Sequence, residues 1–296
     1  MPEEIINFFW NRDKAGYQWD SPPENSPDSA KQDLLVRLLG FTGEGPYLNP
    51  KSFVSEYYLP FENPSLFRTF AETKTDEKGI LQFAERFGQL GPDNHISTWQ
   101  AQIKEMSFAV ALRDMVQARD VANLAAMIRW EKDAIYLETD LRDILIASAD
   151  SGTMERFKRH DPFGPAMFHL QRIINKQLEG QASATLLWTE DRSKLQLIIM
   201  PASLIGALWL QLARTIDQDT HFRACAAGCG KWIALRLSAR ADALYCSPRC
   251  RTAAWRSRPP KGQKPTKQKR PKKAGVDLGV ELSPKPIKKH EKPRKA

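Results

Sequence analysis

Four cysteines constrain the C-terminal part of this chain more than any other feature. The chain of 296 residues has four cysteines in all, and they lie within 26 residues as two Cys-x3-Cys pairs separated by 16 residues. Two short pairs with such a gap suit a tetrahedral zinc site, because each pair supplies two thiolates and the gap lets the second pair fold back onto the first. The sequence therefore predicts one structural Zn2+. Its ligands are Cys225, Cys229, Cys246 and Cys250.

Disulfides and four unrelated buried thiols are the other interpretations of these cysteines. Residues 1–25 show no secretory signal, since acids and prolines come early instead of a basic start followed by a long apolar run. A chain of this length also builds enough core to fold without disulfides. We therefore expect reduced, metal-binding cysteines in a cytoplasmic protein.

The residues beside the two pairs favour one finger architecture. Gly228 and Gly230 allow the positive φ of a tight knuckle around the first pair, and residues 231–235 can follow as a short strand. Near the second pair, Ser247 is a good helix N-cap and Pro248 suits the first helical position. The last cysteine then lies in the first turn of a helix, where backbone N–H groups favour the thiolate. Knuckle, hairpin and helix predict a treble-clef zinc finger; a zinc ribbon with two knuckles is the alternative.

Charge is distributed unevenly along the chain. Residues 1–220 carry 23 Lys or Arg against 31 Asp or Glu, residues 221–255 carry six against one, and residues 256–296 carry fifteen against three. The formal net charge of +9 therefore hides an acidic N-terminal part and a basic C-terminal end. Such an end favours a polyanionic partner, nucleic acid before a membrane. The alternative is that the Lys/Pro-rich tail only improves solubility.

That tail, residues 259–296, is predicted to be disordered. It has almost no large apolar side chains, so it cannot bury enough surface to offset the entropy cost of ordering. Its lysines can contact phosphates without reading sequence, and it has no aromatic residue to stack on bases.

The finger is predicted over residues 221–258 and a separate body over residues 1–220.

The body is expected to be mostly helical, because its apolar residues recur largely at helical spacing. Helices are predicted within residues 66–87, over the long amphipathic segment 97–130, between Gly164 and Leu178, and over 204–216, with one β-hairpin from strands 184–188 and 195–199. The predicted fold class is mainly α: a helical N-terminal body with a small β-hairpin, then a C-terminal four-cysteine treble-clef zinc finger and a disordered basic tail.

Residues 195–213 form an uncharged stretch close in length to a membrane-spanning helix. Pro201 with Ser203 interrupts this stretch, Gln196 and Gln211 lie within it, and its first half alternates like a strand. We expect a buried strand leading into a buried helix, and no contact with a membrane.

The motifs of common enzyme classes do not occur in the sequence. The five histidines form no spaced pair, and HExxH, GxSxG, P-loop and GxGxxG motifs are missing. The closely spaced carboxylates from Glu131 to Asp143 are interpreted as the solvated face of a helix, and His169 as a core histidine. A closed four-cysteine site leaves no coordination position for water, so we predict that the chain is not an enzyme.

The order of these parts resembles that of bacterial CGNR-type zinc-finger proteins. The likeness is carried by the run Pro201–Trp209, by Phe222–Cys225 and by Tyr245–Arg251, and it is sharpest over about residues 200–256. In that family a helical ABATE-type N-terminal domain precedes a treble-clef finger associated with DNA binding. The four cysteines carry over by position. The signature itself is degenerate, because Arg-Thr-Ala follows Cys250 where the family has Gly-Asn-Arg.

The predicted function is that of a cytoplasmic, non-enzymatic zinc-finger protein that binds nucleic acid, DNA in preference, and regulates transcription. Arginines at the finger helix are expected to contact phosphates or base edges. They are Arg249, Arg251, Arg256 and Arg258. The body is expected to sense a small ligand or a partner, or to form a homodimer. The alternatives are a protein–protein interaction module in which zinc only stabilises the fold, and an enzyme whose site lies in the body.

Overall fold

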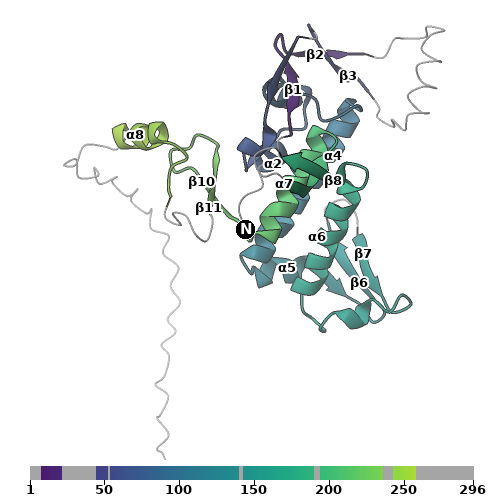
Figure 1. Ribbon diagram of the computed structural model, residues 1–296. Helices are drawn as coiled ribbons and strands as arrows, with labels where there is room; N and C mark the ends of the chain where they lie inside the picture. Colours follow the sequence, from purple (N-terminus) through teal and green to yellow (C-terminus); the bar gives the residue numbers. More distant parts are fainter. Residues whose placement is uncertain are drawn as a thin grey trace, which may run out of the picture. The chain divides into compact units, whose positions relative to one another are not determined.

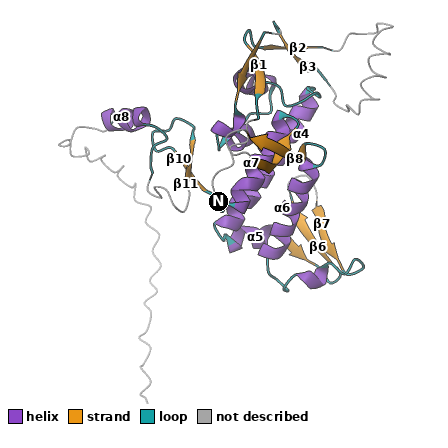
Figure 2. Cartoon of the chain, in the orientation of Figure 1, coloured by secondary structure: helices purple, strands orange, loops and turns teal. Residues whose placement is uncertain are grey.

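Helices and small antiparallel sheets alternate along the chain (Figures 1 and 2). The structure is a computed structural model that describes residues 8–21, 45–52, 54–139, 143–189, 194–235 and 243–257. The described elements are β1 (Trp10–Asp13), β2 (Tyr17–Asp20), β3 (Tyr47–Pro50), β4 (Ser55–Tyr58), η1 (Pro60–Glu62), α2 (Leu66–Ala71), α3 (Glu77–Phe87), α4 (Ile96–Gln117), α5 (Val121–Met127), β5 (Ile128–Trp130), β6 (Ala134–Glu138), β7 (Asp143–Ser148), η2 (Met154–Arg156), α6 (Phe163–Leu178), β8 (Ala182–Thr189), β9 (Lys194–Pro201), α7 (Leu204–Asp217), β10 (His221–Ala224), β11 (Trp232–Leu235) and α8 (Pro248–Arg256).

The prediction of a mainly α fold is wrong. Of the described residues, 43% are helical and 25% lie in strands, which form five small sheets. Part of the missed strand content is N-terminal, where β1 pairs with β4 and β2 pairs with β3. Each of these strands has four residues and pairs with a strand far along the chain, so no periodic pattern in the sequence signals them. Gly88, at the end of α3, lies against β1 with φ of 86°, and a Cβ there would lie 2.2 Å from the carbonyl oxygen of Asn11.

The rest of the missed strand content follows α4. The segment predicted as one helix over residues 97–130 divides, because Arg119 takes a positive φ of 52° and Asp120 caps α5 by accepting a hydrogen bond from the backbone N–H of Asn123. The acidic residues that follow lie before β6 or on strands β6 and β7, and Asp140 lies outside the described residues, so the interpretation of this run as a helix face is wrong. Three of its carboxylates surround one guanidinium, that of Arg129 on β5. They belong to Glu131, Glu138 and Asp143.

The core of the body lies where α2, α4, α6 and α7 meet (Figure 1). Phe70 of α2 packs against Phe83 of α3 and Trp99 of α4, with ring centroids 5.1 and 6.3 Å apart. The predicted helices within 66–87, after Gly164 and from Leu204 are confirmed, and His169 is buried as expected. The largest buried side chains are Trp99, Trp209, Phe67, Phe70, Leu48, Leu66, Ile80, Leu90, Ile103, Met106 and Leu112.

The uncharged stretch at residues 195–213 divides into the strand β9 and the largely buried helix α7, as predicted. The expectation that the strand is buried is wrong, because Leu195, Leu197 and Ile199 are exposed on one face of β9. Ser203 separates them and caps α7, because its hydroxyl accepts a hydrogen bond from the backbone N–H of Gly206. No helix in the described ranges is long and apolar enough to cross a membrane.

The chain divides into two units, Met1–Arg256 and Ser257–Ala296. Apart from Ser257, the second unit lies outside the described residues, and so do the predicted disordered tail and Arg258. The division of the first unit into a body and a finger stays a prediction.

Candidate metal centre

The first cysteine pair lies in the turn of a β-hairpin. β10 and β11 pair antiparallel, and the residues between them carry Cys225 and Cys229. The backbone N–H of Cys225 donates to the carbonyl of Lys231 at 2.9 Å, which closes the knuckle. Gly228 and Gly230 take positive φ values of 67° and 72°, as the knuckle prediction requires. The strand expected after this pair is therefore confirmed as β11, whereas β10 was not predicted.

The second cysteine pair lies at the start of α8. Ser247 caps this helix, because its hydroxyl accepts a hydrogen bond of 3.2 Å from the backbone N–H of Cys250. Pro248 is the first helical residue, so the predicted helix start is confirmed and Cys250 lies in the first turn. Residues 236–242 lie outside the described residues, so the hairpin expected between the knuckle and the helix is untested.

The hairpin turn and the helix start bring all four sulfur atoms together. The Sγ atoms lie within 4.8 Å of one another, and Cys246 Sγ is 3.5 Å from both Cys229 Sγ and Cys250 Sγ. These separations are far longer than the ~2.05 Å of a disulfide bond, and all four thiols are free. Four sulfurs at about 2.3 Å from a zinc ion are about 3.8 Å apart in a tetrahedron. The four cysteines therefore fit a metal ion of the size and chemistry of Zn2+.

Two of the thiols have pKa values shifted in opposite directions. Burial raises the pKa of Cys225, but hydrogen bonds from the backbone N–H groups of Cys246 and Ala227 outweigh burial and lower that pKa to about 7. Burial, and then hydrogen bonds with the thiols of Cys250 and Cys229, raise the pKa of Cys246 to about 12. Four thiolates this close repel one another, so the fully ionised set needs a cation between them. Metal binding at this site must therefore displace protons and strengthen as the pH rises.

The finger has almost no apolar core. Among its described residues, 221–235 and 243–257, Cys225 is the one buried residue, at 5% exposure. The backbone N–H of Ala226 donates to the carbonyl of Leu244 and joins the two cysteine pairs at 2.9 Å. Four thiolate ligands leave no coordination position for substrate or water. A metal ion held by all four cysteines would have the closed coordination that is typical of structural zinc sites.

The predicted arginines of the finger lie on α8 and are exposed. Arg249 and Arg256 lie two turns apart on one side of the helix, and Arg251 lies on another. One turn after Arg251 is Trp255, which is 72% exposed. Trp255 was not predicted as a site residue, although it is the one aromatic residue of α8.

The finger hairpin also makes a contact with the body that the sequence did not predict. Arg68 of α2 is buried, and its guanidinium carbon lies 4.6 Å from the ring centroids of both Phe222 in β10 and Trp232 in β11. The same guanidinium binds the carboxylate of Asp114 on α4, with Nη1 2.8 Å from Oδ2. Trp232 Nε1 donates to Glu72 Oε1 at 2.8 Å. We call this cation, its carboxylate and the two rings the Arg68 contact.

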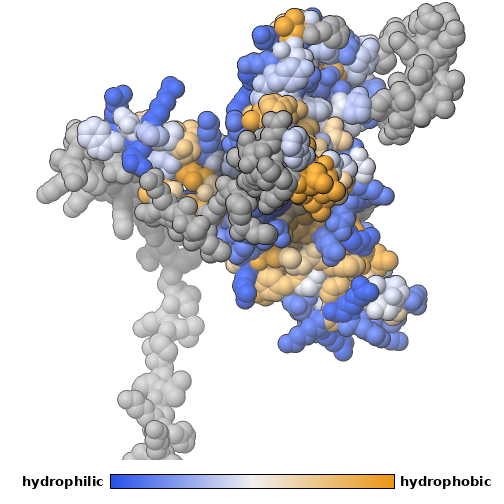
Figure 3. Space-filling model, in the orientation of Figure 1, coloured by the Kyte–Doolittle hydropathy of each residue, from blue (hydrophilic) through white to orange (hydrophobic). Residues whose placement is uncertain are grey.

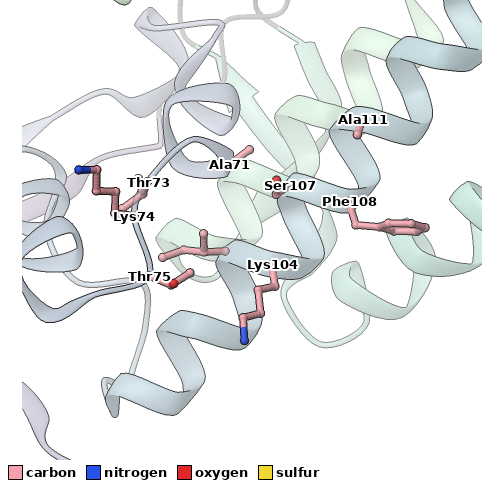
Figure 4. Close-up of a pocket in the computed structure, with 9 residues that line it drawn as sticks. Ala71, Thr73, Lys74, Thr75, Lys104, Ser107, Phe108 and Ala111 are labelled. Atoms are coloured by element: carbon pink, nitrogen blue, oxygen red, sulfur yellow. The ribbon is translucent and has the colours of Figure 1, made fainter. Parts of the chain in front are cut away.

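A shallow pocket of about 460 Å3 lies beside α4 (Figure 4). Lys74 and Lys104 point in different directions there, and Phe108 points away from Lys74, so the polar groups do not converge on one point (Figure 4). A larger hollow of about 1020 Å3 between α4, α6 and β7 is lined by charges of both signs. They include Lys104, Arg172 and Lys176 with Glu105, Glu138 and Glu179. The larger hollow is the better place for the small ligand expected of the body.

No protein-family model, no curated protein and no solved structure matches this chain. The likeness to CGNR-type zinc-finger proteins therefore stays a prediction from the sequence.

Proposed function

We propose that the finger, with Zn2+ held by its four cysteines, binds nucleic acid, and that the chain acts as a DNA-binding regulator of transcription. The observation that supports this is α8, which begins at the metal centre and carries exposed Arg249, Arg251 and Arg256. The described residues of the finger contain five Lys or Arg and no Asp or Glu. A helix that starts at the metal centre and carries exposed positive charge suits a phosphate backbone.

In this proposal zinc has a structural role. The metal fixes the start of α8 against the hairpin, so the arginines approach the duplex from a defined direction. Their guanidinium groups can contact phosphates or the edges of guanine in the major groove. No residue is assigned a catalytic role. The reduced cysteines agree with a cytoplasmic protein, since cytosolic thiols are kept reduced.

Binding of a short DNA duplex by the full-length chain, measured by fluorescence anisotropy at several salt concentrations, tests the proposal. Replacing Arg249 and Arg251 with alanine should flatten the slope of log affinity against log salt by about 2, because each phosphate contact contributes about one unit. The matched control replaces Arg156 and Arg159 with alanine, which removes the same charge from exposed positions of the body. Its slope should not change.

The alternative is a protein–protein interaction module with a structural zinc. The exposed apolar side chains of the finger favour it, since Trp255 is 72% and Leu244 is 49% exposed. A Trp255→Ala variant distinguishes the two functions. If neither this variant nor the arginine pair changes DNA affinity while the wild-type chain retains zinc, nucleic-acid binding by the finger is wrong and the alternative stands.

A further inference from the structure

One face of the β8–β9 hairpin is apolar and exposed along most of its length. Residues directly opposite each other in an antiparallel pair share a face. In this hairpin Trp188 is opposite Leu195, and Leu186 is opposite Leu197. We call the face that holds these pairs the outer face. Its members are Ala184, Leu186, Trp188, Leu195, Leu197 and Ile199.

All residues of the outer face are exposed, and none of them is polar. Its five large side chains are between 45% and 63% exposed. Only the β9 side of the other face packs on the body: Ile198 is buried, and Met200 packs against the cluster of Phe8, Ala207 and Leu210. The β8 residues of that face are exposed, and two of the three, Ser183 and Thr185, are polar. An antiparallel sheet with one solvated face normally carries polar residues on that face. This hairpin instead presents apolar residues to solvent, and Figure 3 shows apolar surface gathered over β8.

The size of this face suits a second copy of the chain. With about 200 Å2 for a large apolar residue, the exposed fractions amount to roughly 600 Å2, the upper end for a patch on a monomer. Two such faces would bury about 1,200 Å2 in total, which reaches the lower limit of a stable, specific interface. Sheet faces pack on one another about 10 Å apart with their side chains interdigitating.

The chemistry of the face also favours a second copy. An interface around a two-fold axis uses the same patch on both chains, so the patch must be complementary to itself. An uncharged, apolar face meets this requirement, because it brings no like charges together. It offers no group that would recognise a phosphate or a charged peptide.

We propose that the outer face of the β8–β9 hairpin is a homodimer interface, in which a second copy of this chain packs the same face across a two-fold axis. This proposal does not depend on nucleic-acid binding. The dimer would contain two metal centres, one from each chain.

Sedimentation equilibrium of the full-length protein over a range of concentrations tests the proposal. The wild-type chain should sediment with twice its mass of 33.7 kDa. Replacing Leu195 and Leu197 with threonine keeps the β-propensity of the strand while it removes apolar surface. We expect the dimer dissociation constant to rise at least about 100-fold, since each dimer loses four leucines. The matched control replaces Val121 of α5 and Leu145 of β7 with threonine. These residues are 53% and 48% exposed and lie outside the hairpin, so this variant should stay dimeric.

Hydrogen exchange of the wild-type hairpin adds a test that needs no substitution. The β8 and β9 amides should be more protected at concentrations above the dissociation constant than below it. A wild-type chain that is monomeric at every concentration overturns the proposal, and so does a threonine variant that dimerises as tightly as the wild type. A monomer that binds phosphatidylcholine–phosphatidylglycerol vesicles, and loses this binding on substitution of the two leucines, would assign the face to lipid instead.

Discussion

The body and the finger of this chain are stabilised in different ways. The body buries a continuous set of aromatic and aliphatic side chains between its helices, several with no exposed surface at all. The finger buries Cys225 among its described residues and has four thiols where a core would lie. Burial of apolar area accounts for the stability of the first region. The second region has no such core, and we expect its stability to depend on a metal ion and on its contact with the body. The two regions should therefore respond to different perturbations.

The largest expected effect is loss of the metal. Cys229→Ser removes one of four ligands, and we expect the chain to lose its zinc and the region 222–256 to unfold. Apparent binding energies of structural zinc are on the order of 10–16 kcal/mol, far more than this finger can replace with apolar contacts. The body should keep its thermal transition. Elemental analysis measures the loss of zinc, and limited proteolysis measures the unfolding of the finger. The control is Arg251→Ser, which changes a finger residue that is not a metal ligand.

A substitution in the core of the body should have the opposite result: the body should lose stability while zinc stays bound. Phe83 of α3 is 4% exposed and packs between Phe70, Phe87 and Trp99. Phe83→Ala should lower the free energy of unfolding of the body by about 3–5 kcal/mol, from lost transfer energy and the cavity left behind. One zinc per chain should remain bound below the transition. The control is Phe9→Ala, because Phe9 is exposed. It should change the free energy of unfolding, measured for both variants by denaturant titration, by less than about 0.5 kcal/mol.

Arg68→Met tests whether the two regions are coupled. Methionine keeps much of the apolar stem but removes the guanidinium from between Phe222 and Trp232 and from Asp114. We expect a loss of about 1–3 kcal/mol, as for a hydrogen-bonded charge that leaves its partner behind. The finger hairpin should become more sensitive to trypsin while zinc stays bound. Unchanged digestion of the finger would show that the Arg68 contact does not hold it to the body.

The same contact predicts a pH dependence of smaller size. Burial raises the pKa of Asp114, but hydrogen bonds and charges from Arg68 and then Arg113 outweigh burial and lower the pKa below its usual range. A carboxyl whose pKa is depressed on folding stabilises the protein above its unfolded pKa of about 3.9, and this contribution is lost as pH falls through the folded pKa. Asp114→Asn should therefore be less stable than the wild type at pH 7, and the difference should shrink as the pH falls through the lowered pKa of Asp114.

Metal loss would confuse this comparison, so the zinc content is measured at every pH and the two proteins are compared at equal zinc content. A stability difference that persists at pH 2 would mean that the asparagine variant perturbs packing rather than charge. The control is Asp133→Asn, at an exposed position before β6. Its difference from the wild type should be small at all pH values.

The sequence predicted those parts of the structure that short-range chemistry determines. The cysteine spacing indicated the four residues that come together, and Ser247 with Pro248 indicated where α8 begins. The β8–β9 strands and α7 followed from local alternation and helical spacing. The turn predicted at residues 190–193 lies outside the described residues.

The sequence did not predict what depends on distant pairing. β1 and β4 pair across about 44 positions of sequence, and four-residue strands leave no period to detect. The acidic run after Arg129 was taken for a helix because charged residues are common on solvated helices, but here cross-strand pairing with one arginine decides its conformation. Nothing in the sequence indicated that Arg68 is buried against the finger hairpin, since an arginine between apolar residues of a short helix usually faces solvent.

X-ray absorption spectroscopy at the zinc edge, on full-length protein purified without chelators, tests directly whether the four cysteines bind zinc. The account predicts one zinc per chain with four sulfur neighbours at about 2.3 Å and no nitrogen or oxygen in the first shell. Protein without zinc, a first shell that contains nitrogen or oxygen, or sulfur–sulfur bonds at about 2.05 Å would contradict the four-cysteine metal centre.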